Sequence, residues 1–119
     1  MVTAVTSFTR SGVADWLVQR VSAVILLAYF GYVGFVLATG IDYADWAALF
    51  AQTWMKVFSL LALFALAAHA WIGIWGVLTD YLTERLLGPK GNVLRIALQL
   101  LVSLSLVIYV IWGVQILWG

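Results

Sequence analysis

Hydrophobic residues in this chain fall into three long runs, separated by short polar stretches. The runs cover approximately residues 16–39, 56–79 and 93–117. An α-helix rises 1.5 Å per residue, so each run is long enough to cross the roughly 30 Å hydrocarbon core of a bilayer. The pattern predicts an all-α membrane protein with three transmembrane helices that form a single domain over residues 1–119.

The polar stretches predict how the runs are joined. Asp15 is expected to cap the first helix and Gly40 to end it. Residues 43–52 are expected to form a short interfacial helix, because aromatic residues of the kind found at membrane surfaces gather there. The second connection, residues 82–95, contains glycine and proline turn signals.

Composition narrows the class of protein. The 119 residues are 66% hydrophobic and 9% charged, which no soluble domain of this size can accommodate. The absence of cysteine excludes disulfides, iron–sulfur ligation and thiol chemistry within the chain. A net charge of +1 gives no basis for nucleic-acid binding. The polar start lacks the pattern of a secretory signal peptide, and the spans leave no room for an aqueous catalytic domain.

Basic residues predict the orientation. Arg10 and Arg20 precede or enter the first run, and Arg85, Lys90 and Arg95 lie in or beside the second connection, whereas the first connection has only Lys56 at its end. The positive-inside rule therefore places the N-terminus in the cytoplasm and the C-terminus outside.

The single histidine of the chain, His69, lies in the second run, where residues 57–79 carry no formal charge. It belongs to one helical face that is otherwise mostly small: Phe58, Ala62, Ala65, His69, Gly73, Gly76 and Asp80. Two interpretations are open. The small residues either let another helix approach closely or leave space for a flat ligand. The imidazole either bonds to a neighbouring polar group or binds a cofactor.

Three further residues have chemistry suited to membrane electron transfer. Arg20 either extends to the lipid headgroups or binds an anion such as a haem propionate, and the Ser22 hydroxyl lies nearby. A b-type haem bound by two histidines would need a second chain, because this chain supplies one. Tyr81 could donate a hydrogen bond to a quinone, with Asp80 as a neighbouring base, or the two could simply end the helix at the interface.

Several segments resemble one family. HAWIGIWGVLTDY (residues 69–81), KVFSLLALF before it and RSGVADWLVQRVSA near the start are similar to the hydrophobic membrane anchor subunits of bacterial succinate dehydrogenase (respiratory complex II). The length and the spacing of the three runs agree as well. The resemblance covers nearly all of the chain, although the third run matches in character only.

The resemblance implies a role and a set of partners. His69 stands at the position of the axial ligand to haem b iron, Arg20 near the haem propionates, and Tyr81 with Asp80 at the ubiquinone site. A second anchor chain, the cytochrome b subunit, would share the haem, and the flavoprotein and iron–sulfur subunits would dock on the cytoplasmic face of the bacterial inner membrane. The chain itself would be non-catalytic.

Two alternatives remain open. One is an anchor of a quinol:fumarate reductase, since the sequence does not fix the direction of electron flow. The other is a small non-redox membrane protein in which His69 only packs. A haem spectrum of the purified assembly distinguishes the second alternative from the others.

Overall fold

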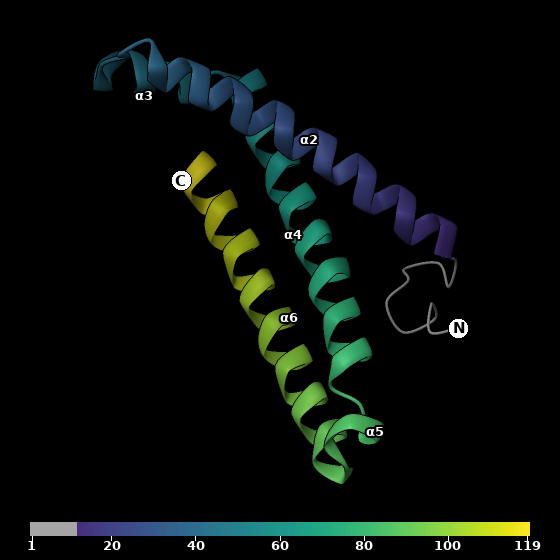
Figure 1. Ribbon diagram of the computed structural model, residues 1–119. Helices are drawn as coiled ribbons and strands as arrows, with labels where there is room; N and C mark the ends of the chain where they lie inside the picture. The colour runs from purple at the N-terminus through teal and green to yellow at the C-terminus, as the bar shows by residue number, and fades with distance from the viewer. Residues whose placement is uncertain (1–11) are drawn as a thin grey trace.

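Three long helices make up most of residues 12–119, the part of the chain that the structure describes, as the hydrophobic runs predict (Figure 1). The computed structural model describes residues 12–119, where the long helices are α2 (Gly12–Ala38), α4 (Thr53–Tyr81) and α6 (Pro89–Trp118). Each is long and apolar enough to cross a membrane. Two short helices join them, α3 (Tyr43–Ala51) and α5 (Glu84–Leu87). The prediction of an all-α protein with three spans is therefore confirmed.

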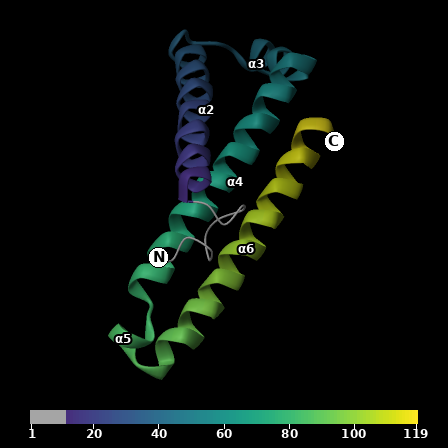
Figure 2. The same cartoon turned by 90° about the vertical axis from the view of Figure 1, so that its right-hand side faces the viewer.

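Helix α4 is the centre of the arrangement, because it packs against both other long helices. Figures 1 and 2 show α6 running beside α4 in the opposite direction, while α2 crosses α4 obliquely. The longest dimension is 55 Å, which exceeds the thickness of a hydrocarbon core. Any site on α4 is thus positioned mainly by its contact with α2 or α6.

The first connection agrees with the sequence in outline. Helix α2 ends at Ala38 and the chain turns at Gly40, whose φ of +76° favours glycine. The expected interfacial helix is α3, and the Asp42 side chain caps it by accepting a hydrogen bond from the Asp45 N–H at 2.8 Å. The expectation that Asp15 caps α2 is wrong. Asp15 lies inside the first turn of the helix, where its charge is favourable to the helix dipole.

The second connection is shorter than expected, because α6 begins inside the predicted stretch of residues 82–95. Thr83 caps α5 through its side chain, and Gly88 turns the chain with φ +71°. Helix α6 then begins at once, with Pro89 in its first turn, where a missing N–H costs nothing. Lys90 therefore belongs to the first turn of α6 rather than to a loop.

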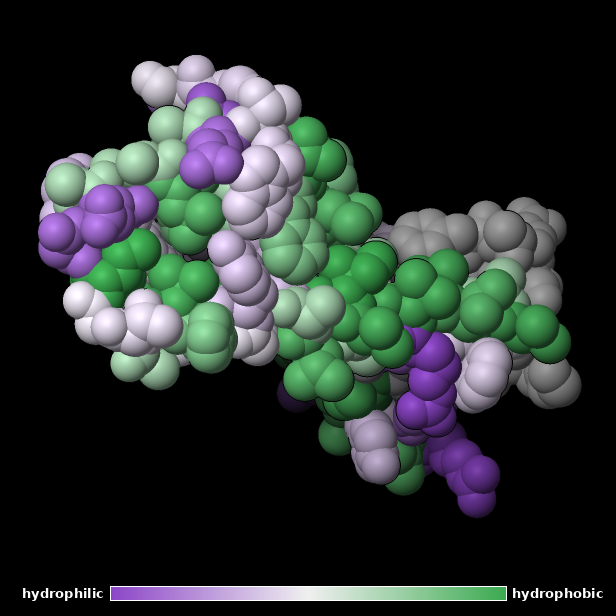
Figure 3. All heavy atoms as spheres, turned by 90° about the horizontal axis from the view of Figure 1, so that it is seen from above, coloured by the Kyte–Doolittle hydropathy of each residue, from purple (hydrophilic) through white to green (hydrophobic). Residues whose placement is uncertain are grey.

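Most of the surface is apolar. Large hydrophobic side chains are exposed along all three long helices, and Leu27 and Leu100 are examples with 76% and 67% exposure. Figure 3 shows hydrophobic side chains covering much of one face, with hydrophilic ones gathered in separate groups. Few side chains are buried among the described residues, and Met55 is the one that is completely enclosed. Such a surface requires lipid or partner helices around it.

Candidate functional site

His69 lies where α2 crosses α4. Its Nδ1 atom is 3.1 Å from the hydroxyl oxygen of Ser22 on α2. The same hydroxyl donates to the backbone carbonyl of Gln19, one turn earlier, at 3.0 Å. Ser22 is only 4% exposed and His69 is half-buried. The structure thus anchors one edge of the imidazole to α2 and leaves part of the ring at the surface of the chain.

The small face of α4 is largely used for helix packing. Ala62 and Ala65 are buried, and a side chain added at Gly73 would meet the amide nitrogen of Gln19 at 3.4 Å. Small residues therefore let α2 approach α4 closely here, which is the first of the two interpretations of this face. Gly76 differs, because nothing within residues 12–119 lies within 4 Å of an added side-chain carbon. Space for another molecule begins there, about two turns from His69.

The donor atoms around His69 fit an axial haem ligand. Neutral imidazole binds iron through one nitrogen while the other donates a hydrogen bond that fixes the ring. Nδ1 faces the Ser22 oxygen, and Nε2 has no hydrogen-bond partner within the part of the chain that the structure describes. No three His, Asp or Glu side chains gather into a metal site within residues 12–119. His69 therefore has a ring nitrogen positioned to bind a ligand from outside the described part of the chain.

Arg20 is not brought to His69 by this chain. It lies two residues before Ser22 and so projects about 200° around the helix from the Ser22–His69 contact. The side chain is exposed, and its guanidinium carbon is 5.5 Å from the centre of the Trp16 ring, one turn earlier. A cation over an indole ring is held by the ring's electron density. The charge is thus held at the N-terminal end of α2.

Asp80 and Tyr81 lie in the last turn of α4, where both side chains are exposed. Tyr81 has 65% of its surface accessible, so its phenol is free to meet a molecule from outside the chain. The two side chains are neighbours in sequence and therefore point about 100° apart around the helix. A pocket that uses both must be completed by a partner chain or by lipid.

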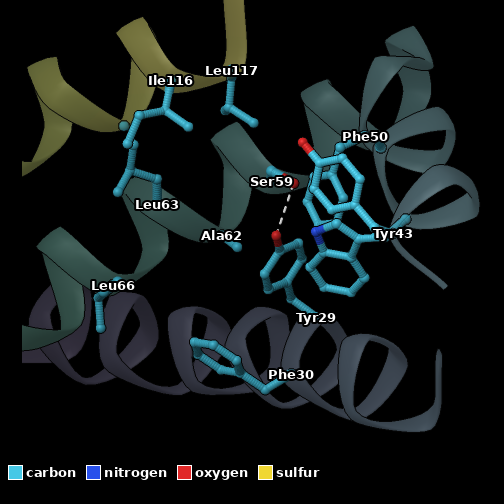
Figure 4. A pocket seen from close by; sticks show the side chains of 13 residues that line it. Tyr29, Phe30, Tyr43, Phe50, Ser59, Ala62, Leu63, Leu66, Ile116 and Leu117 are labelled. Carbon is cyan, nitrogen blue, oxygen red and sulfur yellow. Dashed lines mark hydrogen bonds between the residues drawn. The ribbon is translucent and has the colours of Figure 1, made fainter. Parts of the chain in front are cut away.

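A cavity lies in the other half of the molecule, away from Asp80 and Tyr81. It has a volume of about 530 Å³ and lies among α2, α3, α4 and α6. Figure 4 shows Tyr29, Tyr43 and Phe50 around it, with the Tyr29 hydroxyl hydrogen-bonded to that of Ser59 at 2.8 Å. The sequence did not predict this cavity, since its lining is assembled from four separate helices.

Sequence reasoning missed the partner of His69. It noted Ser22 only as a hydroxyl near Arg20, and it did not consider Gln19. A usable signal was present, because Gln19 and Ser22 are three residues apart and so share one face of an otherwise apolar helix. Polar residues with this spacing in a transmembrane helix indicate the side that faces another helix.

Comparison with known proteins identifies the family. Residues 3–111 match the model of the family described as succinate dehydrogenase/fumarate reductase transmembrane subunit. A relative in Coxiella burnetii (strain RSA 493 / Nine Mile phase I), the "succinate dehydrogenase hydrophobic membrane anchor subunit", is 39% identical over 112 residues. That similarity covers 92% of this chain and 91% of the relative. The chain, with its three membrane-spanning helices, therefore belongs to the succinate dehydrogenase/fumarate reductase transmembrane subunit family.

Proposed function

We propose that this chain is the hydrophobic membrane anchor of a succinate:ubiquinone oxidoreductase and that it helps to bind haem b and ubiquinone. Family membership and a relative of nearly equal length support the anchor role. They also argue against the non-redox alternative. Succinate would be oxidised on the flavoprotein subunit, and electrons would pass through the iron–sulfur subunit to ubiquinone at the membrane.

The contact between His69 and Ser22 carries the haem assignment. Fixing one ring nitrogen while the other has no partner within residues 12–119 is the arrangement that a metal-binding imidazole needs, which supports an iron ligand here. Here Nδ1 is held at 3.1 Å from the serine oxygen, and Nε2 remains for an iron atom. When bound, haem b takes up and returns single electrons. His69 would hold the haem iron, Ser22 would orient its ring, and Arg20 would supply a positive charge for the haem carboxylates.

The ubiquinone assignment depends on the end of α4. Tyr81 would donate its phenolic hydrogen to a quinone oxygen, and Asp80 would hold or pass a proton beside it. The exposure of the tyrosine in the single chain supports a site that lies between subunits, where the quinone could enter from the membrane.

Partners and orientation follow from the same role. The cytochrome b subunit would cover part of the apolar surface and supply the second histidine. The basic residues Arg85, Lys90 and Arg95 lie around α5 and the start of α6, which supports a cytoplasmic position for this end in a bacterial inner membrane. The iron–sulfur and flavoprotein subunits would dock on that side, and the C-terminus would be periplasmic.

The experiment that tests the proposal is purification of this chain with its co-purifying subunits from the native membrane. A reduced-minus-oxidised spectrum of b-type haem and succinate-dependent reduction of ubiquinone are expected. An assembled complex without haem would refute the haem assignment. A complex that oxidises succinate only with soluble acceptors would refute the quinone assignment.

The family description also covers fumarate reductase, so a quinol:fumarate reductase is the second candidate. The succinate:ubiquinone oxidoreductase and the quinol:fumarate reductase differ in the quinone they prefer and in the direction of electron flow. Comparing the rate of ubiquinone reduction by succinate with the rate of fumarate reduction by a low-potential quinol decides between them.

A further inference from the structure

The buried hydroxyl of Ser22 contacts both the Gln19 carbonyl oxygen, which can only accept a hydrogen bond, and His69 Nδ1, which can donate or accept one. Ser22 is 4% exposed, and it lies on the face of α2 that packs against α4. Its oxygen is 3.0 Å from the Gln19 carbonyl oxygen and 3.1 Å from His69 Nδ1. Both contacts are within hydrogen-bonding distance, so the hydroxyl serves both partners at once.

The direction of these hydrogen bonds follows from what each atom can do. A carbonyl oxygen only accepts, and a serine hydroxyl has a single hydrogen to donate. The Ser22 hydrogen therefore goes to Gln19, and the serine oxygen accepts from His69. This arrangement places the imidazole hydrogen on Nδ1 and the lone pair on Nε2.

We propose that Ser22 is a positioning residue that fixes the tautomer and the ring orientation of His69 for iron binding through Nε2. The inference rests on the proposed function, because it requires haem at His69. A hydrogen-bond acceptor on the far nitrogen also makes an imidazole ligand more basic. The oxidised iron benefits most from a basic ligand, so Ser22 favours the oxidised haem.

A purely structural role would act differently. Serine in transmembrane helices commonly bonds to a carbonyl one turn back, and this satisfies its hydroxyl without any further partner. Such a serine would affect helix packing but not the haem. The two roles are separated by a measurement on the haem itself, with a second buried serine as the reference.

Ser59 provides that reference. It is 7% exposed and joins α4 to α2 through its hydrogen bond to the Tyr29 hydroxyl, shown in Figure 4. It lies 10 residues before His69 on the same helix, about 15 Å along the axis. Ser59→Ala therefore removes a buried interhelical hydroxyl of the same interface without touching the imidazole.

The experiment is a redox titration of haem in the purified complex that carries Ser22→Ala, Ser22→Thr, Ser22→Cys or Ser59→Ala. For Ser22→Ala we expect the ratio of reduced to oxidised haem at a fixed potential to rise about tenfold, the lower end of the effect of such supporting groups. For a one-electron couple this corresponds to about 59 mV toward higher potential. The low-spin electron paramagnetic resonance signal should broaden, because the ring is no longer held in one orientation.

The other variants complete the test. Ser22→Thr keeps a hydroxyl and should behave like the unmodified complex, whereas Ser22→Cys, a weaker acceptor of similar size, should give a smaller shift in the same direction. Ser22→Cys also serves if the alanine variant does not assemble. Equal potentials and spectra in the Ser22→Ala, Ser22→Cys and Ser59→Ala complexes would overturn the positioning role while leaving the haem assignment intact. An unmodified complex without haem would overturn both.

Discussion

Replacement of Tyr81 by phenylalanine removes a single oxygen atom from the end of α4. The residue is 65% exposed, and no hydrogen bond of its hydroxyl is observed within residues 12–119. Phenylalanine keeps the ring and the helix, so the free energy of unfolding should change by less than about 0.5 kcal/mol. Any large effect on activity must therefore come from a molecule that meets this hydroxyl.

The expected loss of activity follows from the strength of one hydrogen bond. A hydrogen bond between neutral groups contributes about 0.5–1.5 kcal/mol, and about 1.4 kcal/mol corresponds to a factor of ten. We expect kcat/KM for ubiquinone to fall by roughly fivefold to tenfold in Tyr81→Phe, near the upper end of that range. Electron transfer from succinate to a soluble artificial acceptor should be unchanged, because that acceptor takes electrons before the quinone site.

The assay compares the two acceptors on the same preparation, so differences in assembly cancel. Tyr109→Phe is the matched control, since Tyr109 is 62% exposed but lies on α6, away from the end of α4. A loss of activity that is equal with both acceptors, or equal in the two variants, would refute the role of Tyr81 in quinone binding.

Two further predictions concern the connections between the long helices. Gly91→Ala should lower the free energy of unfolding in detergent by about 1–3 kcal/mol, because the added carbon would lie 2.5 Å from the backbone oxygen of Thr83, which cannot move aside as a side chain would. Gly34→Ala is the control, because no described residue lies within 4 Å of an added side-chain carbon there, and equal stability of the two variants would contradict the packing at Gly91. Asp42→Ala should cost α3 about 1 kcal/mol by removing its cap and should speed amide hydrogen exchange in that helix by roughly fivefold. Unchanged exchange would mean that the cap does not stabilise α3.

The three spans were predictable from sequence because a membrane requires long, uninterrupted apolar helices. The positions at which the helices begin and end were harder to predict from the sequence. Helix α6 starts at Pro89 rather than near Val93. Proline is favoured in the first turn of a helix as well as in turns, so its presence did not show where the helix begins. The prediction that Asp15 caps α2 was wrong for a related reason, because aspartate is favourable both at the position before a helix and inside its first turn.

The candidate site was predictable only in part. A lone histidine among small residues drew attention to His69, but its contact with Ser22 depends on where two helices cross, and hydrophobic periodicity does not give crossing angles. Arg20 illustrates the same limit. Its position in the sequence suggests proximity to the site, whereas helical geometry directs it away from His69 within this chain. The partner histidine and the quinone pocket involve other chains, which no property of this sequence can position.

The central claim is that His69 binds haem iron, and the reduced-minus-oxidised spectrum of a His69→Leu complex tests it most directly. The substitution should leave the complex assembled, because an interhelical hydrogen bond in a membrane is worth only about 0.6 kcal/mol and Ser22 keeps its bond to the Gln19 carbonyl. We predict that the b-type haem signal of the unmodified complex is lost or shifted in the variant. An assembled His69→Leu complex with full haem content and an unshifted spectrum would contradict the account.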